Sequence, residues 1–258
     1  NATAGVIVGG TTGESATLLE AELRELTTTA LEHVAGRMKV IAGAGTSSTA
    51  ESVARARWLS ALGVDGLLVV TPAYVKPTQE GLIRHFTAVA EASSVPILLY
   101  NVPGRTAVDL LPPTVARLAT VPNIVALKEA VGDIERVREL LRLAPGIALL
   151  SGDDATCREA VLAGAKGVIS VTANVAPREM ADMIAAALEG DATRAGRIDA
   201  RLAGLHEILF VEANPIPVKW VLERMGLIGQ GIRLPLTPLS NRFQSRVFAA
   251  MERAGLTG

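Results

Sequence analysis

The chain contains 258 residues, of which 49% are hydrophobic and 20% charged, and its net charge is −1. This length and composition suit one large α/β domain with a substantial core, whereas the balanced charge excludes a basic surface for nucleic acid or for an anionic membrane. The single cysteine excludes a disulfide framework and a cysteine-based metal site. No apolar run is long enough to cross a bilayer, and the start lacks the basic and apolar regions of a signal peptide, so we expect a cytoplasmic protein.

Apolar runs of strand length alternate with segments of helix length as far as about Asn174, a pattern that predicts a parallel sheet with crossover helices. The predicted strands are residues 5–9, 39–42, 66–70, 95–99, 124–130, 147–151 and 167–171. The predicted helices between them, including any capping residue, are residues 17–35, 48–62, 79–92, 112–119, 134–143 and 153–163. Two of these helices are predicted to begin with a capping box, formed by Thr17 with Glu20 and by Ser48 with Glu51.

After Asn174 every predicted element is a helix, namely residues 177–188, 192–211, 215–225 and 239–254. We therefore divide the chain into a barrel region, residues 1–174, and a region of residues 175–258 that holds the last barrel helix and a C-terminal helical extension. The strands are apolar on both faces and the glycine motifs of nucleotide-binding folds are absent. Both features favour a (β/α)8 TIM barrel over an open doubly wound sheet.

Only seven strands can be identified where such a barrel has eight, and the chain starts at Asn1 rather than at a methionine. We therefore expect the first βα unit of the barrel to be absent from this chain. Removing one strand from a closed barrel exposes the edges of its neighbours, which here are residues 5–9 and 167–171. Because both segments are apolar and prone to form strands, we expect the chain to be less stable than one that includes the unit.

The predicted strand at residues 124–130 carries one lysine within an apolar run. Alternation along a strand places Val125 and Leu127 on one face and Ala126 and Lys128 on the other. A lysine that is forced into an apolar environment has a lowered pKa and becomes a nucleophile toward carbonyl groups. The alternative is a lysine at the end of a strand that extends its amine to water.

Further polar residues follow the predicted strands, at the ends where barrel enzymes hold their active sites. These residues are Thr11, Thr12, Tyr74, Tyr100, Arg105 and the turn Gly152-Asp153-Asp154. A lysine can condense with a ketone while a phenol moves the protons. A glycine-rich turn at residues 10–13 can bind one carboxylate through backbone N–H groups, and a guanidinium can bind a second. We predict a site for a small keto acid. We expect no metal at the two aspartates, because no histidine or further carboxylate joins them at ligand spacing and capping accounts for one.

Five motifs carry a resemblance to a known family: GTTGES (10–15), YNVPGRT (100–106), LKEA (127–130), SGDD (151–154) and NPIPVK (214–219). On these motifs the chain resembles the dihydrodipicolinate synthase family, within the N-acetylneuraminate lyase superfamily of class I aldolases, over essentially all of its length. The resemblance implies condensation of pyruvate with aspartate 4-semialdehyde to 4-hydroxy-tetrahydrodipicolinate, in the diaminopimelate route of lysine biosynthesis. It also implies a homotetramer built as a dimer of dimers, with no cofactor.

The resemblance further implies the role of each catalytic residue. Lys128 would form the Schiff base with pyruvate, and Tyr100 would be the central proton carrier. Thr11 and Tyr74 would complete the proton relay, with Tyr74 extending into the site of a neighbouring subunit.

Substrate binding is implied for four other residues. Thr12 would help to hold the pyruvate carboxylate, and the backbone of Gly152 and Ile169 would lie close to the substrate. Arg105 would receive the carboxylate of the semialdehyde. Lys219, in the last motif, is interpreted as structural or interfacial.

The resemblance also bears on feedback inhibition by lysine. Ser15, Ala16 and Glu51 match positions that line the effector site of lysine-sensitive relatives. The positions that depart from the sensitive pattern are Glu20, Ser47 and Ala73. Because the last of these replaces an aromatic contact, we expect weak inhibition.

Two alternatives to this function remain open. A sister aldolase that cleaves N-acetylneuraminate or a 2-keto-3-deoxy sugar acid would share Lys128 and Tyr100, and only Arg105 and the double threonine favour the synthase. A non-catalytic barrel that serves as a binding module would be favoured by the loss of Lys128 or Tyr100, and both are present.

Overall fold

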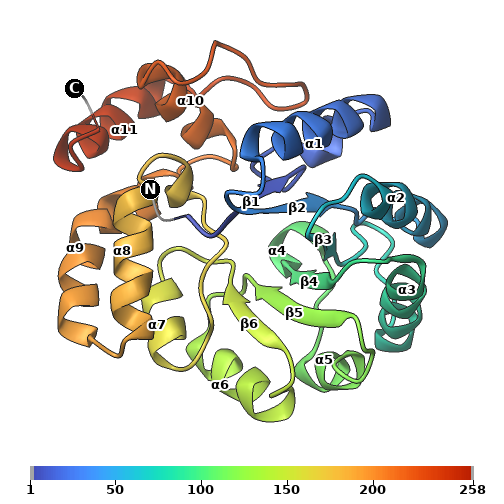
Figure 1. The fold of residues 1–258 in the computed structure, drawn as a ribbon. Coiled ribbons are helices and arrows are strands. Elements are labelled where there is room, and N and C mark those ends of the chain that lie inside the picture. The colour runs from blue at the N-terminus through green and yellow to red at the C-terminus, as the bar shows by residue number, and fades with distance from the viewer. Residues whose placement is uncertain (1–2, 257–258) are drawn as a thin grey trace.

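A computed structural model describes residues 3–256 and shows one parallel sheet surrounded by helices. Six strands pair in chain order, each with its neighbours in sequence. The strands are β1 (Gly5–Val8), β2 (Lys39–Gly43), β3 (Gly66–Val70), β4 (Ile97–Asn101), β5 (Ile124–Glu129) and β6 (Ala148–Ser151). Figure 1 shows that the sheet curves around a centre, so that the carboxyl ends of its strands come together.

Helices connect successive strands and form a ring around the outside of the curved sheet (Figure 1). These are α1 (Glu20–Val34), α2 (Thr49–Ala61), α3 (Gln79–Ala92), α5 (Pro112–Leu118), α6 (Ile134–Leu143) and α7 (Cys157–Leu162). Three short elements lie in the loops that follow strands, namely the 3-10 turns η1 (Ser15–Thr17) and η2 (Thr172–Asn174) and the single helical turn α4 (Pro103–Thr106). The predicted alternation of strands and helices is therefore confirmed.

Strand β4 is buried on both faces and β3 nearly so, as their composition predicts, whereas β1 is half-buried and Val125 of β5 is exposed. Leu127 belongs to the core between the sheet and the outer helices. Its neighbour Ala126 instead joins Leu68, Leu98 and Tyr100 in a smaller cluster inside the curved sheet. Because successive side chains point to opposite faces, the inner face of β5 also receives Lys128, as the alternation predicted.

The helices after residue 174 build a separate core beside the sheet. They are α8 (Pro177–Leu188), α9 (Ala192–Ile208), α10 (Ile216–Arg224) and α11 (Asn241–Arg253). Met180, Met183, Leu205 and Val221 are buried among them. In Figure 1, α11 lies above α8 and α9, and α10 lies between α11 and α1. No helix within residues 3–256 is long and apolar enough to span a membrane.

The seventh predicted strand, residues 167–171, is reduced to a single parallel bridge between Ser151 and Val168. The N–H of Ile169 still donates to the carbonyl oxygen of Ser151 at 2.8 Å. Beyond that point the N–H groups of Val171 and Thr172 donate instead to a carboxylate oxygen of Asp154, at 2.9 and 2.8 Å. The aspartate thus draws the chain away from the sheet and into η2. Among the described residues no ladder joins this segment to β1, so the six-stranded sheet stays open.

Two helix starts test the predicted capping boxes. The box of Thr17 and Glu20 is wrong, because α1 begins at Glu20 and the carboxylate of Glu22 accepts from the N–H of Leu19 at 2.8 Å. Thr17 lies in η1, where its hydroxyl donates to the carbonyl of Glu14. The box of Ser48 and Glu51 is half formed. The Ser48 hydroxyl accepts from the N–H of Glu51 at 3.3 Å, but the N–H of Ser48 donates to the Thr46 hydroxyl at 3.1 Å instead of to the Glu51 carboxylate.

Strand β4 extends two residues further than predicted, to Asn101. Its start is delayed because Pro96 has no N–H to donate and the N–H of Val95 donates to the hydroxyl of Ser93. At its other end, Asn101 is paired with Glu129 of β5. Tyr100 is therefore part of the strand rather than the first residue of the loop, which fixes its backbone more firmly.

Candidate active site

The site is centred on two side chains that are neighbours on adjacent strands. Tyr100 of β4 and Lys128 of β5 are paired in the parallel register, and both side chains lie on the inner face of the sheet. The Lys128 Nζ atom lies 4.3 Å from the centroid of the Tyr100 ring, and the tyrosine is only 6% exposed. The predicted lysine and one of the two predicted tyrosines are thus in direct contact.

The surroundings of Lys128 make its amine more reactive. Burial lowers its pKa from 10.5 to about 8, since desolvation penalises the charged form. The negative charge of Asp154 acts in the opposite direction, and the positive charge of Arg105 adds to the lowering. A shift of this size increases the neutral, nucleophilic fraction of the amine at pH 7 roughly 300-fold. The amine can therefore attack a carbonyl carbon near neutral pH.

The phenol of Tyr100 remains protonated and lies near a second hydroxyl. Burial raises its pKa, while the nearby hydroxyl of Thr11 and the positive charge of Arg105 partly oppose that rise. Thr11 lies in the glycine-rich turn after β1, as predicted for a residue of the site. A phenol in contact with an amine and close to another hydroxyl can carry a proton to or from a reacting group.

Thr12 and Arg105 come together through a residue to which the sequence analysis gave no role, Asn214. The guanidinium of Arg105 donates to the Asn214 carbonyl oxygen at 3.0 Å. The Asn214 side-chain nitrogen donates to the Thr12 hydroxyl, also at 3.0 Å. Asn214 is buried, at the turn that leads into α10. Its place in the NPIPVK motif was the only signal for it, because nothing local indicates a contact with residues more than 100 positions away.

Gly152 closes the site next to the lysine. A Cβ atom at this position would lie 2.9 Å from Lys128 Cε and 2.8 Å from Ala130 Cβ, so any other residue would displace the amine. Ile169 packs against the inner cluster that contains Tyr100. Both predicted backbone positions are therefore adjacent to the Lys128–Tyr100 pair.

Tyr74 lies apart from this group. Its side chain is 91% exposed, and its N–H donates to the Thr106 carbonyl oxygen at 3.4 Å. Among the described residues it has no hydrogen bond with Thr11 or Tyr100. Its backbone has a φ of +74°, a conformation that costs free energy for a residue with a Cβ atom. The loop thus holds this phenol outward, away from the site of its own chain.

The two aspartates after β6 have separate structural tasks. Asp153 accepts from the N–H and the hydroxyl of Thr156 before α7, at 3.0 and 2.7 Å. The predicted capping by an aspartate is wrong, because the N-cap of α7 is Thr156, whose side chain makes no capping hydrogen bond. Asp154 is 2% exposed and holds the segment that enters η2. Within residues 3–256 no group of three His, Cys, Asp or Glu side chains could hold a metal ion.

The other predicted residues lie beside the site. Ser15 and Ala16 form part of η1, and Glu51 in the first turn of α2 pairs with Arg55 at 2.8 Å. Lys219 forms an ion pair with Glu14, which links α10 to the turn after β1. That lysine therefore stabilises the junction between the helical region and the sheet.

Comparisons with known proteins agree with this geometry. Residues 1–254 match the model of the dihydrodipicolinate synthetase family. The 4-hydroxy-tetrahydrodipicolinate synthase of Azoarcus sp. is 55% identical over 255 residues, which is 98% of this chain and 87% of the relative.

Two solved structures have the same fold. Acinetobacter baumannii dihydrodipicolinate synthase, complexed with pyruvate, superposes with a TM-score of 0.98 at 46% identity, covering 99% of this chain and 88% of that one. The Cyanidioschyzon merolae enzyme with lysine bound gives a TM-score of 0.96 at 42% identity and the same coverage.

Proposed function

The chain belongs to the dihydrodipicolinate synthetase family, and we propose that it is a 4-hydroxy-tetrahydrodipicolinate synthase, a lyase of the class I aldolase type. In this proposal it condenses pyruvate with aspartate 4-semialdehyde in the diaminopimelate route of lysine biosynthesis. The observation that carries the proposal is the amine of Lys128, desolvated and 4.3 Å from the ring of Tyr100.

The reaction begins at that amine. Lys128 Nζ attacks the ketone carbon of pyruvate, and the carbinolamine loses water to form a Schiff base. Tyr100 donates the proton that the departing hydroxyl needs, and the nearby hydroxyl of Thr11 can replace that proton. Loss of a methyl proton then gives an enamine, whose carbon attacks the aldehyde of the second substrate. The amino group of that substrate finally displaces Lys128, closes the ring and frees the amine.

Carboxylate binding determines which substrates fit. Thr12 and the glycine-rich turn bind the carboxylate of pyruvate, with the backbone of Gly152 and Ile169 beside it. Arg105 binds the carboxylate of the semialdehyde, because a guanidinium can hold it through two parallel hydrogen bonds. Asn214 contacts both binding residues and so sets the distance between the two carboxylates.

Architecture and assembly belong to the same proposal. The curved parallel sheet within its ring of helices supports a (β/α)8 barrel that extends to residue 174, followed by the helical region. The exposed phenol of Tyr74, held outward by its loop, supports an assembly in which it completes the proton relay of a neighbouring subunit. A homotetramer built as a dimer of dimers would provide that contact.

Trapping of the Schiff base tests the proposal. Incubation with pyruvate and borohydride should add the mass of a reduced pyruvyl group to the peptide that contains Lys128. An adduct on a different lysine, or no adduct on folded protein, would refute it. Faster cleavage of N-acetylneuraminate or a keto-deoxy sugar acid than condensation of the semialdehyde would instead favour the sister aldolase.

A further inference from the structure

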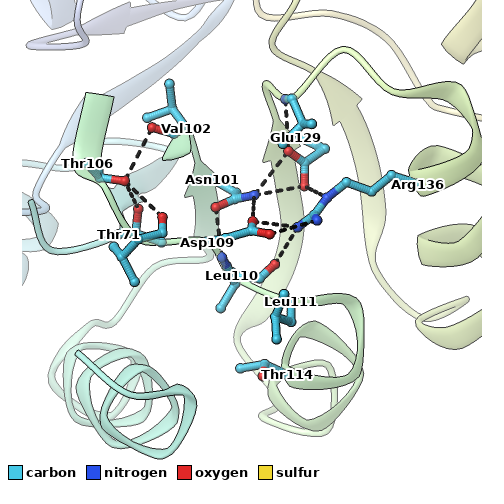
Figure 2. Close-up of polar contacts among 12 residues, drawn as sticks. Thr71, Asn101, Val102, Thr106, Asp109, Leu110, Leu111, Thr114, Glu129 and Arg136 are labelled. Carbon is cyan, nitrogen blue, oxygen red and sulfur yellow. Dashed lines mark hydrogen bonds and ion pairs between the residues drawn. The ribbon is translucent and has the colours of Figure 1, made fainter. Parts of the chain in front are cut away.

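A network of four polar side chains lies on the outer face of the sheet, opposite the face that carries Lys128 and Tyr100, and Figure 2 shows its contacts. Its members are Asn101, Asp109, Glu129 and Arg136. They come from β4, the loop before α5, the end of β5 and the first turn of α6. The reaction described above uses none of them.

Arg136 binds both acidic members of this network. Its Nε donates to Glu129 at 2.9 Å, and its two terminal nitrogens donate to the two oxygens of Asp109 at 3.0 and 2.8 Å. One terminal nitrogen also donates to the carbonyl oxygen of Leu110 at 2.7 Å. The planar guanidinium can make these bonds in only one orientation, so it fixes the relative positions of β5 and the loop.

Asn101 joins the two carboxylates from the other side. Its side-chain nitrogen lies 2.8 Å from Asp109 and 3.1 Å from each oxygen of Glu129. Its oxygen accepts from the N–H of Leu110 at 2.9 Å. Asn101 is fully buried and Glu129 is 3% exposed. A buried polar group that lacks a hydrogen-bond partner costs free energy. The network therefore favours the one arrangement in which these groups are all bonded.

The position of the network relates it to three parts of the site. The pair Asn101 and Glu129 follows the pair Tyr100 and Lys128 by one residue in the register of β4 and β5. Asp109 and Leu110 end the loop that begins with α4, which carries Arg105. One guanidinium therefore connects the strand of the amine with the loop of the carboxylate-binding residue, and Asn101 adds the strand of the phenol through the same two carboxylates.

Stability alone gives little reason for such a network. Replacing a buried ion pair by apolar residues of similar volume is often neutral or stabilising, and the rest of this outer face is packed with leucine, isoleucine and valine. What a fork of charged hydrogen bonds adds is a single fixed geometry. A displacement of about 1 Å between reacting groups can slow a reaction about 100-fold.

We propose that Arg136, with Asn101, Asp109 and Glu129, positions Lys128 against Tyr100 for Schiff-base formation and anchors the loop of Arg105 to the same point. These four are positioning residues, since none of them contacts the reacting atoms. The inference rests on the proposed function, because it concerns the amine and phenol to which that function assigns the chemistry.

The experiment compares Arg136→Lys with Arg138→Lys. The second arginine lies on the same helix in an exposed ion pair with Glu135, so it controls for loss of an arginine from α6. The single-turnover rate of Schiff-base formation is measured by borohydride quenching well below the melting temperature of each variant. We expect Arg136→Lys to slow Schiff-base formation about 10- to 100-fold, because an ammonium cannot make the parallel hydrogen bonds of the guanidinium. Arg138→Lys should leave the rate unchanged.

A second readout separates positioning from stability. The groups that face the Lys128 amine are Tyr100, Asp154 and Arg105, and Arg136→Lys leaves all three in place. If the amine moves toward water, its pKa rises from about 8, and the acid limb of the rate profile shifts to higher pH. A variant that melts at lower temperature yet keeps the wild-type rate and pH profile would overturn the proposal.

Asp109→Asn covers the case in which Arg136→Lys does not fold. Asp109 is the most exposed member of the network, with 35% of its side chain accessible, and the change preserves its shape. We expect a several-fold higher KM for the semialdehyde, because the loop that contains Asp109 also carries Arg105. An unchanged KM would count against the proposed role of the network. Formation of the pyruvyl adduct by the wild type tests the proposed function. The ratio of the variant rate to the wild-type rate tests the positioning role of the network. A failure of the function and a failure of the network therefore give different results.

Discussion

A basic side chain lies on each face of the sheet at the carboxyl end of β5, and the two differ in their partners. On the outer face Arg136 is surrounded by two carboxylates and a carbonyl oxygen. On the inner face Lys128 has no ion pair among the described residues, and its Nζ atom lies against the ring of Tyr100. The two faces are separated by the thickness of one strand.

This difference shows how burial alone does not decide what a basic group does. A buried cation that is paired and hydrogen-bonded keeps its charge and becomes part of a rigid frame. A buried cation without such partners has a lowered pKa, which makes its neutral form available for chemistry. The strand thus holds a reactive group on one face and the groups that position it on the other.

The largest expected effect comes from removing the reactive group. Lys128→Ala should reduce condensation at least about 1000-fold, because the covalent intermediate can no longer form. Steady-state assay of the condensation measures the loss, and borohydride trapping should find no pyruvyl adduct. The exposed Lys166→Ala should behave like the wild type. Residual adduct in Lys128→Ala would mean that another lysine carries the chemistry.

The next largest effect is expected in the free energy of unfolding, which should respond differently to loss of Arg136 and loss of Lys128. Arg136→Met is expected to lower the free energy of unfolding by about 3–5 kcal/mol, because it leaves two carboxylates without their cation. Lys128→Met should not destabilise the protein at pH 7, because it removes a desolvated charge that has no ion-pair partner. Urea unfolding of both variants at pH 7 measures the contrast. Equal destabilisation would show that the two cations are held alike.

The stability of the wild type relative to Lys128→Met should also depend on pH. The pKa of Lys128 is about 8 in the folded protein, against 10.5 for an exposed lysine, so the unfolded chain binds more protons between these two pH values. Stability due to this group therefore rises from pH 8 to 10.5 and is constant below and above that window. We expect a gain of about 3 kcal/mol for the wild type relative to Lys128→Met. Parallel stability curves of the two proteins would contradict the lowered pKa.

A smaller effect is expected at the rim of the inner face. Arg105→Ala should lower kcat/KM for the semialdehyde about 100-fold, since a charged hydrogen-bonding partner of its carboxylate is lost. Schiff-base formation with pyruvate should be largely retained, because the amine is unchanged. Arg105→Lys tests whether charge alone suffices. An equal loss in both half-reactions would indicate that Arg105 supports the whole site rather than one substrate.

Local signals in the sequence were sufficient for most of the elements and for the inner face. Helix α6 begins and ends at the predicted residues, with Asp133 as its N-cap, because apolar periodicity and capping depend on neighbours a few positions away. Lys128 was assigned to its face by alternation alone. Tyr100 and Arg105 were found because they follow a strand whose end must lie at the rim.

Long-range partners could not be found in this way. The start of α1 depends on Glu22, whose carboxylate is held by Arg233 at 2.7 Å, more than 200 positions away. Asp154 ends the seventh predicted strand early by accepting from Thr172. The residues next to these side chains do not indicate such contacts, because the same acidic residue can cap a helix or bind a loop that is distant in the sequence.

The sequence by itself therefore determined the alternating strands and helices, the face on which Lys128 lies and the family motifs. Only the tertiary structure decided that Asn214 connects Thr12 with Arg105 and that Arg136 is paired while Lys128 is not. The physical reason is the range of the interactions. Periodicity and capping act between near neighbours in the chain, whereas the charge state of a buried group depends on partners that only folding brings within hydrogen-bonding distance.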